Sequence, residues 1–421
     1  CQRASAGSPP SCTCRMHRRG SPRPSGAGGA LLDTLAWGVV NGFVYHQPQP
    51  FDMPGPDGPP SPEYLGSEIE RRTAIAQAAF DNKIWRPIIE QWDQELKPAS
   101  IRRHRALFDV ELGQLDDQAL RAHVGACMDH LHAMAYQHHR FNASALAPPG
   151  DFVLQVGAWL GEDPTSFFGV FDGYSPASGV VSPELAPAVE ALRADPDAAA
   201  LLVGDSQAAG RLQELRTRVA AVDEYVRSTG FRLVEGFDVR SLTAIECPEI
   251  ILGRLSAGLE TDTTEARRRA DAFAESVRAR VPAEHQQAFD ELLAEGRLMY
   301  RLRDERGLYS DISAFGLLRL ALLEAGRRLA ARDAVLEPEH LFELDRGEIE
   351  GLLSGSSQPT ATAIAERVAQ QDAIRAQGAP RFLGPPPPEP PPLDQLPPPL
   401  ARVMGVCLLY TSDAADDDYT V

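Results

Sequence analysis

The sequence contains very little lysine, and this scarcity excludes several classes of active site. Lys83 and Lys97 are the only lysines among its 421 residues. A phosphate-binding loop of the G-x-x-x-x-G-K type and a Schiff-base enzyme both depend on a lysine. Neither of these two lysines lies in a glycine-rich context. We therefore expect neither kind of site in this chain.

Cysteine and long hydrophobic runs are also scarce. Within the part of the chain that we expect to fold, only Cys127 and Cys247 occur, which is typical of a reducing cytoplasm. Cys12 and Cys14 have only His17 nearby, so we expect no metal site. The longest apolar stretches, 34–45 and 315–325, fall short of the roughly 18 residues that cross a bilayer. We also identify no signal peptide, and we predict a cytoplasmic protein without a membrane partner.

Charge excludes nucleic acid as the main partner. The formal net charge is −18 at pH 7, although the first 30 residues are rich in arginine and contain no acid. The rest of the chain is therefore more acidic still, and it would repel a phosphate backbone.

Composition divides the chain into five segments. Residues 1–30 lack periodicity and are predicted to be disordered or mistranslated. Residues 31–378 form the expected body, and residues 379–399 form a proline-rich linker. Residues 400–406 are interpreted as the start of a further, mobile domain. Residues 407–421 are interpreted as a tail derived from a sequencing adapter, unrelated to the fold.

Helical periodicity dominates the body and predicts an all-α fold. Between Ala314 and Arg332, apolar residues recur at intervals of three and four. Asp345 followed by Glu348 resembles a capping box. Strand-like alternation is brief, so at most a short strand pair is expected near 231–245. Further helices are expected at 63–79, 85–96, 116–141, 152–160, 182–193, 206–228, 262–281, 283–302 and 361–377.

Histidines gather between 123 and 139, in or near one predicted helix. Their spacing lacks the one-turn ligand pair with a carboxylate that a zinc site requires. Hydrogen-bonded histidines at a helix end explain the pattern, and a substrate pocket formed by Tyr136, His138, His139 and Arg140 stays open as an alternative. No residue of the chain is assigned a catalytic role.

Two other features have structural explanations. The segment 168–179, FGVFDGYSPASG, lacks the last glycine of a G-x-S-x-G nucleophile motif. Trp85 and Trp92 are seven residues apart on one helix face, a spacing typical of core or interface packing. In the alternative interpretation, these two tryptophans and the acidic surface bind a protein partner, and the chain is a non-catalytic interaction module.

The segment from Gly230 onward carries a family resemblance. Gly230 and Arg232 are followed by Glu246 and Pro248, and a later run contains RLRD at 301–304, EAGRRLA at 324–330 and LFELD at 341–345. This order resembles the central region of the phosphoenolpyruvate-utilizing enzymes, the group of phosphoenolpyruvate synthase and rifampicin phosphotransferase. Phe231 stands where that family has a histidine. The resemblance covers about 31–406 and is most specific over 230–353.

The resemblance implies a helical domain that binds a phosphoryl acceptor and docks a mobile phosphohistidine domain. It implies ATP or phosphoenolpyruvate and Mg²⁺ for the intact family, but the chain contains neither the carrier histidine motif nor the nucleotide site, so we expect no cofactor here and no activity of this chain alone. The candidate substrate-binding residues are His138, His139, Arg140, Arg232 and Glu246. The acceptor itself is unknown.

Overall fold

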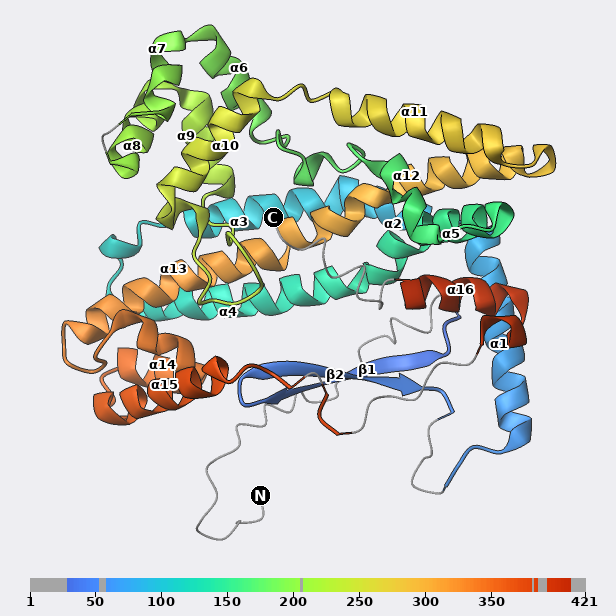
Figure 1. Cartoon of the computed structure of the whole chain (residues 1–421). Helices are drawn as coiled ribbons and strands as arrows, with labels where there is room; N and C mark the ends of the chain where they lie inside the picture. The colour runs from blue at the N-terminus through green and yellow to red at the C-terminus, as the bar shows by residue number, and fades with distance from the viewer. Residues whose placement is uncertain (1–28, 53–57, 205–206, 381, 385–391, 410–421) are drawn as a thin grey trace. The chain divides into compact units, whose positions relative to one another are not determined.

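The computed structural model describes residues 29–52, 58–204, 207–380, 382–384 and 392–409 (Figure 1). The expectations for 1–28, for the prolines at 385–391 and for 410–421 lie outside these residues. Two compact units share the chain. One consists of residues 1–82 and 361–404, and the other of residues 83–360 and 405–421. The fold is mainly helical, as the periodicity predicts.

The first unit contains a β-hairpin that the helical pattern does not predict. Strand β1 (Leu32–Val40) pairs antiparallel with β2 (Phe43–Pro50). Between them, Asn41 and Gly42 have φ values of 53° and 82°. Two positive φ angles are the requirement of the tight hairpin turn that Asn-Gly favours. The Asn-Gly pair between two apolar runs was therefore a usable signal.

Helix α1 (Pro62–Asp81) packs against this hairpin through a buried arginine. The helix begins after Ser61, whose side chain accepts a hydrogen bond from the Tyr64 backbone N–H at 3.2 Å. Arg72 is only 2% exposed, and it binds Asp33 together with the Ala30 carbonyl. Helix α15 (Ala361–Ala376) belongs to the same unit.

The second unit holds most of the helices. They are α2 (Trp85–Gln91), α3 (Lys97–Phe108), α4 (Asp117–Arg140), α5 (Asn142–Leu160), α6 (Ala186–Ala194), α7 (Pro196–Ala199), α8 (Ala208–Arg218), α9 (Ala220–Thr229), α10 (Pro248–Glu260), α11 (Glu265–Arg280), α12 (Gln286–Leu308), α13 (Asp311–Ala330) and α14 (Arg346–Leu353). A π-helical turn at Trp92–Leu96 joins α2 to α3. The capping box predicted at Asp345 and Glu348 is present.

Two apolar cores hold this unit together. One lies among α6, α8, α9 and α10 and includes Leu192, Leu215 and Leu255, all fully buried. The other joins α5, α11 and α12, where the Phe152 ring lies 5.1 Å from that of Phe289. Each buried side chain of this size contributes about 1.5–3 kcal/mol. Helix α13 runs along α4, and α12 along α5 (Figure 1).

A glycine in α13 sets the position of the turn at 230–232. A Cβ built on Gly316 would lie 1.7 Å from the Phe231 carbonyl oxygen. Only glycine permits this close approach of helix and turn. Leu233 and Thr243 then form a single antiparallel bridge, so the strand pair expected near 231–245 is reduced to one bridge.

Several predicted boundaries require correction. The helix expected over 206–228 breaks at Val219, and α5 begins ten residues earlier than expected, with Pro148 and Pro149 inside it. The expected linker ends in helix α16 (Pro398–Leu409), which continues past the boundary placed at Cys407. Leu409, in the last described turn of this helix, packs against the core around Phe152. Helices α3 and α10 were not predicted. Among the described helices, none has the length and apolar character that a bilayer crossing requires.

Candidate functional site

The corner between α12 and α13 collects polar side chains from several other parts of the chain. Helix α12 ends at Leu308 and α13 begins at Asp311, so only Tyr309 and Ser310 connect them. Tyr309 is 3% exposed, Ser310 is fully buried and Asp311 is 5% exposed. Burying polar groups is unfavourable unless each finds a partner. Their partners therefore define the site.

His138, one of the predicted substrate-binding residues, pairs with Asp311. Its Nδ1 lies 2.8 Å from both carboxylate oxygens, and the two side chains are 11% and 7% exposed. The tautomer with its proton on Nδ1 donates to this carboxylate, and in that tautomer Nε2 carries the lone pair that can act as an acceptor or base. The pair has the geometry of a general base whose ring is oriented by an acid.

Two further rings surround His138. His139 stacks on it with 5.0 Å between centroids and remains exposed to solvent. Phe237, from the segment after the turn at 230–232, lies 5.9 Å away at a tilt of 59°. Arg140 is exposed and donates to the Gln91 side chain at 3.3 Å. The structure thus brings His138 and His139 together with Asp311 and leaves Arg140 outside.

Arg232 reaches the same corner through Tyr309. Its Nη2 donates to Glu184 at 2.7 Å, and the Tyr309 hydroxyl donates to the same carboxylate oxygen at 2.6 Å. The guanidinium lies 5.0 Å from the Tyr309 ring centroid, and the Lys97 ammonium lies 4.5 Å from it. Burial opposes ionisation of Glu184, but the Arg232 charge and these hydrogen bonds hold its pKa at about 2. Arg232 is therefore a charged, buried residue with an internal partner.

Glu246 has a different partner. Arg319 in α13 donates to both of its carboxylate oxygens, at 2.8 and 2.9 Å. Arg319 also donates to the carbonyls of Val239 and Arg240, at 2.9 and 3.1 Å. Arg232 and Glu246 therefore do not pair with each other in the described structure, because Arg232 binds Glu184 and Glu246 binds Arg319. Glu246 anchors the segment 239–246 to α13.

The two lysines of the chain neutralise buried glutamates. Lys97 lies 3.0 Å from Glu305, which also accepts the Trp92 indole N–H at 2.8 Å. Lys83 lies 2.9 Å from Glu295. Burial raises the pKa of Glu295, but hydrogen bonds from Arg86, Lys83 and Trp85 outweigh it and hold the value at about 2. Both lysines are thus paired with buried glutamates in the described structure.

Trp85 and Trp92 lie inside the protein, so of the two kinds of packing that their spacing allows, core packing is the one the structure has. Trp85 is 5% exposed and Trp92 is fully buried. The interaction-module alternative required them at the surface, and that part of it is wrong. Over the described ranges, no group of three or more histidine, cysteine or acidic side chains is arranged to hold a metal ion.

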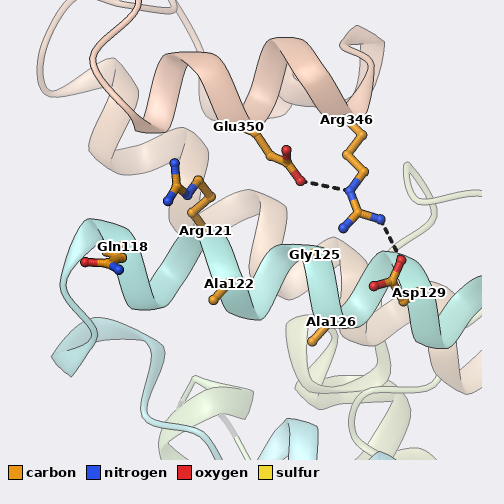
Figure 2. A pocket seen from close by; sticks show the side chains of 8 residues that line it. All are labelled: Gln118, Arg121, Ala122, Gly125, Ala126, Asp129, Arg346 and Glu350. Atoms are coloured by element: carbon orange, nitrogen blue, oxygen red, sulfur yellow. Dashed lines mark hydrogen bonds and ion pairs between the residues drawn. The ribbon is translucent and has the colours of Figure 1, made fainter.

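A surface hollow of about 460 Å³ lies between α4 and α14 (Figure 2). Ala122, Gly125 and Ala126 form its floor, and Arg346 crosses it to bind Asp129 at 2.5 Å and Glu350 at 2.8 Å. Because these charges pair with one another, they do not by themselves favour binding of a ligand over water. The hollow is therefore a weaker candidate than the corner.

The sequence suggested His138, His139 and Arg232 as candidates, but it did not suggest the residues that contact them. Glu184, Tyr309 and Asp311 come from distant parts of the chain, and no motif links them. The only local signal was the polar Tyr-Ser-Asp between two amphipathic helical patterns. Comparison with protein-family models and with curated proteins finds no match for this chain.

Proposed function

We infer that the unit 83–360 is an acceptor-binding helical domain of a phosphotransferase-type protein, of the kind that phosphoenolpyruvate-utilizing enzymes have at their centre. The observation that carries the inference is the His138–Asp311 pair at the α12–α13 corner. Most residues on which the family resemblance rests, 301–345, lie in α12, α13 and the turn after them. Resemblance and geometry thus concern the same part of the unit.

The chemistry of such a domain is positioning and proton removal. In phosphoryl transfer the protein mainly aligns the reactants and balances charge. An acceptor hydroxyl beside His138 would lose its proton to Nε2 as its oxygen forms the new O–P bond. The N–P bond of a phosphohistidine on the mobile partner domain would break in the same step. The residues of this unit would bind the acceptor and take the proton.

We place the binding of ATP or phosphoenolpyruvate and Mg²⁺, which the resemblance implies, outside this unit. Both lysines bind buried glutamates, and the described residues contain no group of three or more histidine, cysteine or acidic side chains arranged around a common metal position. ATP or phosphoenolpyruvate would therefore react elsewhere, and the phosphoryl group would arrive on the mobile domain. This chain alone is accordingly expected to be inactive.

Calorimetric titration of the purified chain tests the proposal. Pyruvate and rifampicin, the acceptors of the two resembling enzymes, are the first probes, followed by a panel of small alcohols and carboxylates. The His138→Ala variant should lose binding, and the exposed His132→Ala variant on the same helix should keep it. Binding that survives in His138→Ala, or a folded chain that binds no member of the panel, would contradict the proposal.

A further inference from the structure

The segment after the turn at 230–232 covers the His138–Asp311 pair with one weakly held aromatic ring. Phe237 is 43% exposed, although its ring lies 5.9 Å from that of His138. Its neighbours Glu235 and Gly236 are exposed as well. A large apolar ring half in water gains only part of the free energy of full burial. In contrast, the His138 and Asp311 side chains are only 11% and 7% exposed.

The two halves of this segment are held very differently. The second half is fixed by Arg319, which binds the Val239 and Arg240 carbonyls, and by the Ser241 backbone N–H, which donates to the Asp238 carbonyl at 2.9 Å. The two ends of the whole segment are joined by a hydrogen bond from the Val234 N–H to the Leu242 carbonyl at 2.8 Å. The first half is exposed and contains Gly236 at a φ of 66°. Glycine adopts both signs of φ readily, so residues 235–237 can move while the rest stays fixed.

We propose that residues 235–237 form a lid over a ligand site at His138, and that the Phe237 ring occupies the place the ligand takes when it binds. The ligand must donate a hydrogen bond to Nε2, because Asp311 holds the proton on Nδ1. The His138 ring is also flanked by two other rings, His139 stacked on it and, when the lid is closed, Phe237 tilted against it. A hydroxyl carried on a planar, apolar group satisfies both requirements.

This inference rests on the proposed function only in naming that ligand as the phosphoryl acceptor. The lid itself is a property of the chain alone. It can therefore be tested without any acceptor, and the two ideas can fail separately.

Modification of histidines by diethyl pyrocarbonate, read residue by residue by mass spectrometry, measures the cover directly. In the native chain, His138 should react more slowly than its exposed neighbour His139. Phe237→Ala should accelerate His138 by about fivefold to thirtyfold, the factors that correspond to one to two kcal/mol of protection. Leu242→Ala, which shortens another exposed apolar side chain at the base of the lid, should leave the rate unchanged.

Two measurements keep the result interpretable. His104 is 2% exposed and should stay unmodified in every variant, so its reaction would reveal general loosening. In that event Phe237→Leu, which keeps an apolar side chain, replaces Phe237→Ala. Adding Asp311→Asn to the open variant should slow His138 severalfold, because the carboxylate makes Nε2 more nucleophilic.

Equal rates for His138 and His139 in the native chain would overturn the lid. An unchanged His138 rate in the Phe237 variants, with His104 still protected, would overturn it as well. Acceleration in the variant without calorimetric binding of any acceptor would leave the lid standing and contradict the proposed function alone.

Discussion

Two buried histidines, His104 in α3 and His130 in α4, should make the unit sensitive to mild acid. They are 2% and 8% exposed, their ring centroids are 5.0 Å apart, and the Nε2 atom of each is buried without a hydrogen-bond partner in the described structure. Burial and the Arg103 charge lower the pKa of His130 to about 4. Burial, His130 and Arg232 lower the pKa of His104 well below its usual range. Both rings are therefore neutral in the folded protein.

The sign and size of the effect follow from these values. In the unfolded chain a histidine has a pKa of about 6.5. Below that pH, His130 binds a proton in the unfolded state but stays neutral in the folded state. The stabilisation is complete above pH 6.5 and is lost as the pH falls towards 4. Between pH 7 and 5, His130 alone should lower the free energy of unfolding by about 2 kcal/mol, at about 1.4 kcal/mol per pH unit. His104 acts in the same direction.

Urea denaturation at pH 7, 6 and 5, followed by tryptophan fluorescence, measures this loss. Carboxylates such as Glu184 and Glu295, with pKa values of about 2, lose their contribution only below about pH 4.5 and do not interfere. His130→Phe should reduce the loss between pH 7 and 5 by about 2 kcal/mol. His132→Phe, at an exposed position two residues away, should not. The same pH dependence in His130→Phe as in the native chain would refute the reasoning.

Three further predictions concern the buried ion pairs and the close helix contact. Arg232→Met should destabilise the unit by about 3–5 kcal/mol in urea denaturation, because it leaves the Glu184 charge buried and unpaired, and adding Glu184→Gln should recover part of this loss. In double-mutant cycles, Arg319 and Glu246 should show a coupling of at least about 0.5 kcal/mol, whereas Arg232 and Glu246 should add independently within that limit. Gly316→Ala should lower stability by about 1–3 kcal/mol, since the new methyl group overlaps the backbone of the adjacent turn, and an unchanged thermal midpoint would contradict the contact.

The fold class could be predicted because a helix leaves a local pattern in the sequence, in its apolar spacing and its capping residues. Apolar residues at intervals of three and four placed α13 within a few residues, and the Asp345–Glu348 box marked the start of α14. The hairpin was missed because its alternation was outweighed by a continuous apolar run, although its Asn-Gly turn is a strong local signal. The break at Val219 was missed because helical spacing continues across it.

The candidate site was only partly predictable, for a physical reason. A cluster of histidines near a helix end is visible in the sequence, so His138 could be found. Its orientation depends on Asp311, 173 residues away, and no local pattern specifies that contact. The same holds for Arg232 and Glu184. Glu246 resembled a ligand-binding residue in the sequence. In the structure it binds Arg319 and so fixes a loop to helix α13.

The most direct test of the account is a crystal structure of the chain soaked with whichever acceptor binds in calorimetry. The account predicts the acceptor hydroxyl within hydrogen-bond distance of His138 Nε2, with Phe237 displaced and the His138–Asp311 pair intact. An acceptor bound in the hollow between α4 and α14, or at any position away from His138, would contradict it.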